Sequence, residues 1–146
     1  MTSNRYFRIG DQPAGRGDKS PPESFDVSPL VGTWVNTKKD TGGFARLVID
    51  EREGRLFLRP FAASTPELCD WGEVEAFAYG ESVDSHTAQA MSASLDTGFA
   101  EVAFQGNLNL GLLVLVTFNR FVNGGGRSNY INREFYYRLK ESPAAA

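Results

Sequence analysis

The sequence has few of the residues that form disulfides and metal sites. Among its 146 residues there is one cysteine, Cys69, and one histidine, His86. A single cysteine excludes an intrachain disulfide framework, and the two residues together are too few soft ligands for a structural zinc site. We therefore expect no metal centre. The cysteine count fits a cytosolic protein but does not by itself decide the redox compartment.

An excess of positive charge and a membrane-length apolar run are also missing. The chain has 15 Lys and Arg against 18 Asp and Glu, a net charge of -3, and so carries no electrostatic footprint for nucleic acid. Its most apolar stretch, 108–118, is too short for a membrane-spanning helix, which needs about 20 residues. Residues 1–10 contain no apolar run of secretory length. We expect a cytoplasmic protein with no nucleic-acid or membrane partner.

The composition predicts three regions. Residues 1–29 hold four of the seven prolines and balanced charges, a composition that buries too little apolar surface to offset the entropy of ordering. We interpret them as a flexible N-terminal arm. Because Tyr6, Phe7 and Ile9 form an apolar patch, the arm is either a lid over a binding site or a solubilising tail. Residues 30–140 form the folded domain, and 141–146 form a C-terminal tail.

The folded domain is punctuated by Gly, Asn and Asp at intervals of about 8 to 12 residues, which is typical of successive β-hairpins. We predict eight strands, at 32–36, 44–50, 55–61, 73–79, 87–95, 99–105, 110–118 and 130–139. The fifth is alanine-rich and also compatible with a helix. Its small residues are spread around all sides, however, and Gly98 in the next turn favours a hairpin.

Eight strands joined by short turns predict an all-β fold, an eight-stranded up-and-down antiparallel β-barrel, because closure removes exposed strand edges. A two-sheet sandwich is the alternative. A barrel of this size is filled by side chains or holds one small ligand. Leu113 and Leu115 alternate with Val114 and Val116, so one apolar set lines the lumen and the other meets a neighbouring element or a partner chain. A homodimer is therefore among the expected assemblies, and an ordinary two-sided core is the alternative.

The first predicted strand contains a short motif. Gly32, Thr33 and Trp34 resemble the Gly-x-Trp that opens the barrel of the calycins, the lipocalins and avidins. The resemblance implies that Trp34 plugs the closed end of the barrel. It also implies that a late-strand arginine, Arg138 or alternatively Arg133, lies against the ring, a contact worth roughly 0.5 to 2 kcal/mol. The avidin pattern of biotin-binding residues is absent, so no biotin binding is implied.

A longer resemblance covers most of the folded domain. The segments Gly-Thr-Trp-Val-Asn at 32–36, Cys-Asp-Trp-Gly at 69–72 and Gly-Arg-Ser-Asn-Tyr at 126–130 are similar to those of a small bacterial domain without an assigned activity. That pattern has a second cysteine and a histidine where this chain has Ser64 and Thr65. The resemblance supports the fold and implies no disulfide or metal role here.

Large side chains with hydrogen-bonding groups mark the ends of several predicted strands. Trp71, Tyr79, Arg127 and Tyr130 lie at junctions between loops and strands, where binding residues are common. We predict that they surround one open end of the barrel and contact a ligand. The structural alternatives are a capped turn at 69–73 and a long hairpin connection at 119–129.

No complete catalytic constellation is present in the sequence. We therefore favour a binding protein that holds a small, mostly apolar molecule in the mouth of the barrel. The alternative is a cofactor-independent cyclase or isomerase of bacterial natural-product biosynthesis, with Asp70, Glu73 and Glu134 as candidate acids or bases. A third possibility is a filled barrel with a structural role. The glycine-rich loop at 124–126 lacks the lysine and the strand-loop-helix context of a phosphate-binding loop, and we expect no cofactor.

Overall fold

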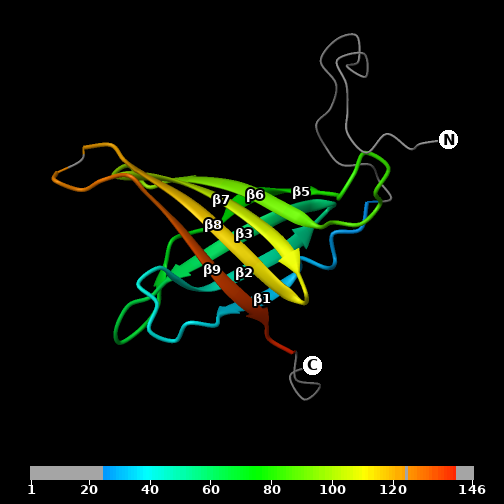
Figure 1. Ribbon diagram of the computed structural model, residues 1–146, viewed down its shortest axis with the longest axis horizontal. Coiled ribbons are helices and arrows are strands. Elements are labelled where there is room, and N and C mark those ends of the chain that lie inside the picture. The colour runs from blue at the N-terminus through cyan, green and yellow to red at the C-terminus, as the bar shows by residue number, and fades with distance from the viewer. Residues whose placement is uncertain (1–24, 124, 141–146) are drawn as a thin grey trace, which may run out of the picture.

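A computed structural model describes residues 25–123 and 125–140 and shows one closed β-barrel (Figure 1). Each barrel strand pairs antiparallel with its neighbours, and β1 pairs with both β2 and β9. The two-residue β4 adds to the edge of β3. The strands are β1 (Gly32–Asn36), β2 (Phe44–Arg52), β3 (Arg55–Ala62), β4 (Cys69–Asp70), β5 (Val74–Tyr79), β6 (Ala90–Asp96), β7 (Ala100–Asn109), β8 (Leu112–Phe121) and β9 (Tyr130–Arg138). The up-and-down barrel is confirmed, and the sandwich is excluded.

The alanine-rich segment forms a strand, β6, which begins at Ala90. The residues just before it pair with the chain ahead of β1: Asp26 forms a parallel bridge with Thr87, and the N–H of Ala88 donates to the carbonyl of Asp26. Val27 is buried there. Residues 25–29 of the predicted arm therefore pack on the barrel, whereas residues 1–24 and the tail 141–146 lie outside the described residues.

Side chains fill the lumen of the barrel. Alternate positions of each strand point inward, as the period of a β-strand requires, and Trp34, Phe104 and Tyr136 are each at most 1% exposed. Leu113 and Leu115 belong to this inward set, so Val114 and Val116 point outward. The sequence did not show which of these two sets points into the lumen, and the structure shows that the leucines do.

Trp34 closes one end of the barrel. Its indole N–H donates to the carbonyl of Leu30 at 2.9 Å, and the guanidinium of Arg138 lies 4.9 Å from the centre of its ring. Arg138 also donates a hydrogen bond to the carbonyl of Pro29. The predicted contact between the tryptophan and a late-strand arginine is confirmed for Arg138, because Arg133 points outward from the middle of β9.

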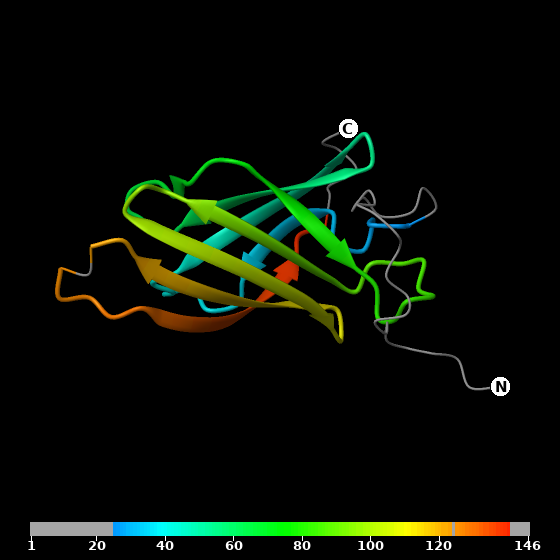
Figure 2. The ribbon, with the colours of Figure 1, turned by 90° about the horizontal axis from the view of Figure 1, so that it is seen from above.

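Successive turns lie at alternate ends of the barrel. The turns 53–54 and 110–111 and the loop 80–89 lie at the closed end, near Trp34. The loops 37–43, 63–73, 97–99 and 122–129 lie at the opposite end, which we call the mouth. Figure 2 shows the loop between β8 and β9 extending beyond the barrel at the mouth, far from the described N-terminal residues. No helix among the described residues is long and apolar enough to cross a membrane.

Candidate functional site at the barrel mouth

One group of aromatic rings caps the lumen at the mouth. Trp71 lies edge-on against Phe44, with ring centres 5.0 Å apart, and its other side meets Phe99 at 6.2 Å. The backbone around Trp71 is fixed locally, because the carboxylate of Asp70 accepts from the N–H of Gly72, whose φ of 87° favours glycine. The tight turn thus places the indole over the end of the lumen.

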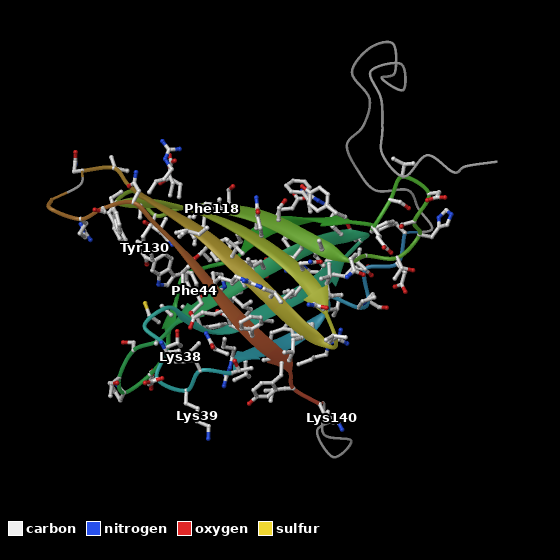
Figure 3. All side chains as sticks on the ribbon, in the orientation of Figure 1. Lys38, Lys39, Phe44, Phe118, Tyr130 and Lys140 are labelled. Atoms are coloured by element: carbon white, nitrogen blue, oxygen red, sulfur yellow. The ribbon has the colours of Figure 1, made fainter. Side chains whose placement is uncertain are left out.

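A second aromatic group lies beside the first. The rings of Phe121 and Tyr130 stack with centres 6.2 Å apart, and the guanidinium of Arg127 lies 4.7 Å from the Phe121 ring. The N–H of Val122 donates to the carbonyl of Phe99, which ties the two groups together. Figure 3 labels Phe44 and Tyr130 at this end. We call the five rings the aromatic rim: Phe44, Trp71, Phe99, Phe121 and Tyr130.

Three of the four predicted ligand residues therefore lie at the mouth, and Tyr79 does not. Tyr79 ends β5 at the closed end, where its hydroxyl lies 2.7 Å from that of Ser92 on the outside of the barrel. The expectation that all four share one end is wrong for Tyr79. The strand that leaves the mouth after Trp71 runs the length of the barrel, so its last residue has to lie at the far end.

Below the aromatic rim the lumen changes from apolar to polar. Thr117 and Asn119 on β8 are buried, and the amide of Asn119 donates to the hydroxyl of Thr117 at 3.1 Å. Thr117 is the Cα partner of Asn132 on β9, and Leu115 is that of Glu134. We call this set the polar layer: Thr41, Thr117, Asn119, Asn132 and Glu134. On the side of β8 and β9 this layer lies between the rim and the apolar core, whereas the Phe44 ring contacts Phe104 of the core directly, with ring centres 5.3 Å apart.

Glu134 is the charged member of the polar layer. Its carboxylate accepts hydrogen bonds from the hydroxyl of Thr41, at 2.7 and 2.8 Å, and from the amide of Asn132 at 2.8 Å. Gly43 lies close beside it, since a Cβ there would lie 2.8 Å from Oε1 of Glu134. No described residue forms an ion pair with Glu134. Neutral donors use only part of the acceptor capacity of a carboxylate.

The other two candidate carboxylates point away from the lumen. Asp70 pairs with Arg59 at 3.1 Å, and Glu73 pairs with Arg52. Both pairs are exposed on the outer face of the barrel. The structure therefore does not bring Asp70 and Glu73 together with Glu134, and of the three only Glu134 lies inside.

Tyr136 supports the polar layer from below. Its hydroxyl and the amide of Asn36 both donate to the carbonyl of Phe44, at 2.6 and 3.0 Å. Burial raises the pKa of the Tyr136 phenol well above its usual range, and the nearby charge of Glu134 adds to the effect. The phenol therefore stays protonated and holds the start of β2 against the rim.

Trp71, Arg127, Tyr130 and Glu134 were named from the sequence, but most of the residues that contact them were not. One sequence pattern indicates part of the polar layer: polar residues occupy every second position on β8, at Thr117 and Asn119, and on β9, at Asn132 and Glu134. No three His, Cys, Asp or Glu residues of the described chain gather into a metal site, and Cys69 is exposed. Comparison with protein-family models, curated proteins and solved structures found no match to this chain.

Proposed function

We propose that the protein binds one small, mostly apolar molecule at the mouth of the barrel. The lumen below the polar layer is filled, so the ligand lies against the aromatic rim. Phe99 and Tyr130 are half exposed, at 50% and 54%, and offer ring surface for an apolar ligand. Binding sites of this class combine apolar walls with a few polar groups that fix orientation.

The observation that carries this proposal is the set of partners around Glu134. A carboxylate inside a small barrel lowers stability unless its charge is well compensated, and Thr41 and Asn132 supply only neutral donors. A ligand that donates a hydrogen bond, such as an amine or a hydroxyl compound, would use the remaining acceptor capacity of the Glu134 carboxylate. The aromatic rim would then hold the apolar part of the ligand, and the hydrogen bond to Glu134 would fix the orientation of the ligand.

The position of Glu134 also favours a second candidate, a cofactor-independent cyclase or isomerase. A half-buried carboxylate under a ring of aromatic side chains has the placement of a general acid or base for an apolar substrate. This hypothesis requires only Glu134 among the three carboxylates named from the sequence. The calycin resemblance supports a ligand-binding barrel, and the bacterial source and cytoplasmic location remain predictions.

The test uses 1-aminoanthracene, an apolar three-ring probe with one amine whose fluorescence rises in an apolar site. We expect it to bind the full chain. Phe99→Ala should weaken binding about tenfold, because it removes one ring of the rim. Glu134→Gln should weaken it several-fold, because a hydrogen bond to a charged acceptor is replaced by one to a neutral amide.

Phe57→Ala is the matched control. Phe57 lies on the outer face of β3, where Arg52 covers its ring at 4.0 Å, and it takes no part in the mouth. The control should bind the probe like the unchanged protein. Equal affinity in the Phe99→Ala and Phe57→Ala variants, or no binding by the unchanged protein, would contradict the proposal.

A further inference from the structure

The outward positions of β8 and β9 are apolar along almost the whole length of both strands. We call them the outer patch: Leu112, Val114, Val116 and Phe118 on β8, with Tyr137, Phe135, Arg133 and Ile131 as their respective Cα partners on β9. Ile131, Phe135 and Tyr137 are 63%, 40% and 43% exposed. The outward face of an antiparallel strand in contact with water is usually polar. These two strands depart from that rule at seven of the eight positions just named.

The opposite side of the same barrel follows the rule. The outer faces of β2, β3 and β5 and the loop before β5 carry three ion pairs, formed by Arg52 with Glu73, Arg55 with Glu75 and Arg59 with Asp70. A fourth pair, Arg120 with Glu101, lies at the mouth end of β7 and β8 and borders the patch. Charge is therefore concentrated away from the outer patch, and Arg133 is the one charged residue within it.

A hollow adjoins the outer patch. It has a volume of about 580 Å³ and lies over the outer sides of β5 to β9. Ala90 and Ser92 on β6 and Gln105 and Asn107 on β7 line it, while Val114 and Val116 form the border that it shares with the patch. The large side chains of Phe135 and Tyr137 on β9 lie beside the hollow, and we call them the ridge. This face therefore has a ridge and a hollow next to each other.

We propose that this face is the interface of a homodimer. In a two-fold dimer the same surface meets itself, so the surface has to be complementary to itself. A ridge beside a hollow satisfies that condition, because the Phe135 and Tyr137 side chains of each copy can enter the hollow of the other. Arg133 already lies 5.4 Å from the Phe135 ring, and an aromatic neighbour suits a guanidinium inside an interface.

The size of the face agrees with a dimer. The strands rise roughly 3.3 Å per residue and lie about 4.8 Å apart. The outer face of β6 to β9, with strands of 7, 10, 10 and 9 residues, thus covers roughly 570 Å². Two copies would bury about 1,100 Å² in total, just above the roughly 1,000 Å² that a specific interface needs. A small molecule in the hollow would leave Ile131, Phe135 and Tyr137 in water. The observations therefore favour a second copy of the chain.

Sedimentation of the full chain at micromolar concentrations tests this proposal. We expect a species of twice the chain mass of 16.1 kDa. Ile131→Glu and Phe135→Glu place a charge in the interface and should each raise the dimer dissociation constant by about a hundredfold or more. Ile131 is the more exposed of the two residues, so its variant retains the fold, which far-UV circular dichroism checks.

Val48→Glu is the matched control. Val48 is an outward residue of β2 on the charged side, opposite Arg59, and the same substitution there should leave the dimer intact. A monomer for the unchanged protein throughout the concentration range would overturn the proposal, as would dimers that persist in both patch variants. A monomer that carries a bound small molecule in native mass spectrometry would instead assign the hollow to a ligand.

Discussion

Arg138 and Trp34 are Cα partners across β1 and β9, and the guanidinium of Arg138 lies 4.9 Å from the centre of the indole ring. Gly32 leaves room for this contact, since a Cβ there would lie 3.2 Å from Cδ of the arginine. The ring, the cation and the turn that ends at Leu30 together close one end of the barrel.

Trp34→Ala should lower the free energy of unfolding by about 3 to 5 kcal/mol, the usual cost of truncating a buried large aromatic side chain. Arg138→Ala should cost less, because the arginine is exposed and loses one cation–π contact and one hydrogen bond. Urea denaturation measures both. A loss below about 1 kcal/mol for Trp34→Ala would contradict the role of Trp34 as a plug.

Gly43→Ala should disturb the polar layer, because the new Cβ would lie 2.8 Å from Oε1 of Glu134 and 3.1 Å from Nδ2 of Asn132. The carboxylate then has to move and lose part of its hydrogen bonding. We expect a loss of about 1 to 3 kcal/mol in stability and weaker binding of 1-aminoanthracene. Gly42→Ala is the control, since a Cβ at Gly42 meets nothing within 4 Å. Similar behaviour of the two variants would show that the contact between position 43 and Glu134 is not tight.

Gly106→Ala tests how densely the lumen is packed. The added Cβ would lie 3.0 Å from Sδ of Met91 and 3.1 Å from Cδ1 of Leu113. We expect a cost of about 1 to 3 kcal/mol, and a smaller cost when Met91→Ala has already removed the thioether. A double-mutant cycle by urea denaturation gives the coupling. Equal costs in both backgrounds would mean that Met91 is not the obstacle.

Stability should fall at alkaline pH because of Tyr136. Burial raises the pKa of its phenol in the folded state above the value of about 10 that it has in the unfolded chain. Above about pH 10 the unfolded chain releases this proton while the folded one keeps it, so the contribution is full below pH 10 and declines as the pH rises. The stability difference between the unchanged protein and Tyr136→Phe should therefore shrink from pH 9 to pH 11 in urea titrations. A constant difference would contradict the raised pKa.

Much of the fold could be predicted because its signals are local. Glycines in the turns and alternation along the strands gave seven strands with nearly correct starts. The remaining strand, β6, was predicted from 87 but begins at Ala90. Thr87 instead pairs with Asp26, a partner far away in sequence that no local pattern indicates. The same contact explains why residues 25–29, which the proline content assigns to the arm, pack on the barrel, since composition alone does not show which short segment pairs with a distant one.

The site was harder to predict because it depends on contacts between distant segments. Thr41 reaches Glu134 from a loop on the other side of the barrel seam, and no local pattern indicates that approach. The separation of Tyr79 from Trp71, in contrast, follows from the predicted topology, since one strand that runs the length of the barrel lies between them. On β9, Ile131, Phe135 and Tyr137 alternate with Asn132, Glu134 and Tyr136. The sequence shows this alternation but does not show which of the two sets faces the lumen.

The seam between β1 and β9 governs when the fold can be completed during synthesis. It joins Trp34 to Arg138, roughly a hundred positions apart. As the chain leaves the ribosome, β1 therefore lacks one neighbour until the last strand has emerged. Until then the sheet has two open edges, and the apolar outward residues of β8 lie next to one of them, which is a condition that favours aggregation. A nascent chain that is cut before Tyr130 keeps both edges open, because β9 is the strand that pairs with β1 and β8.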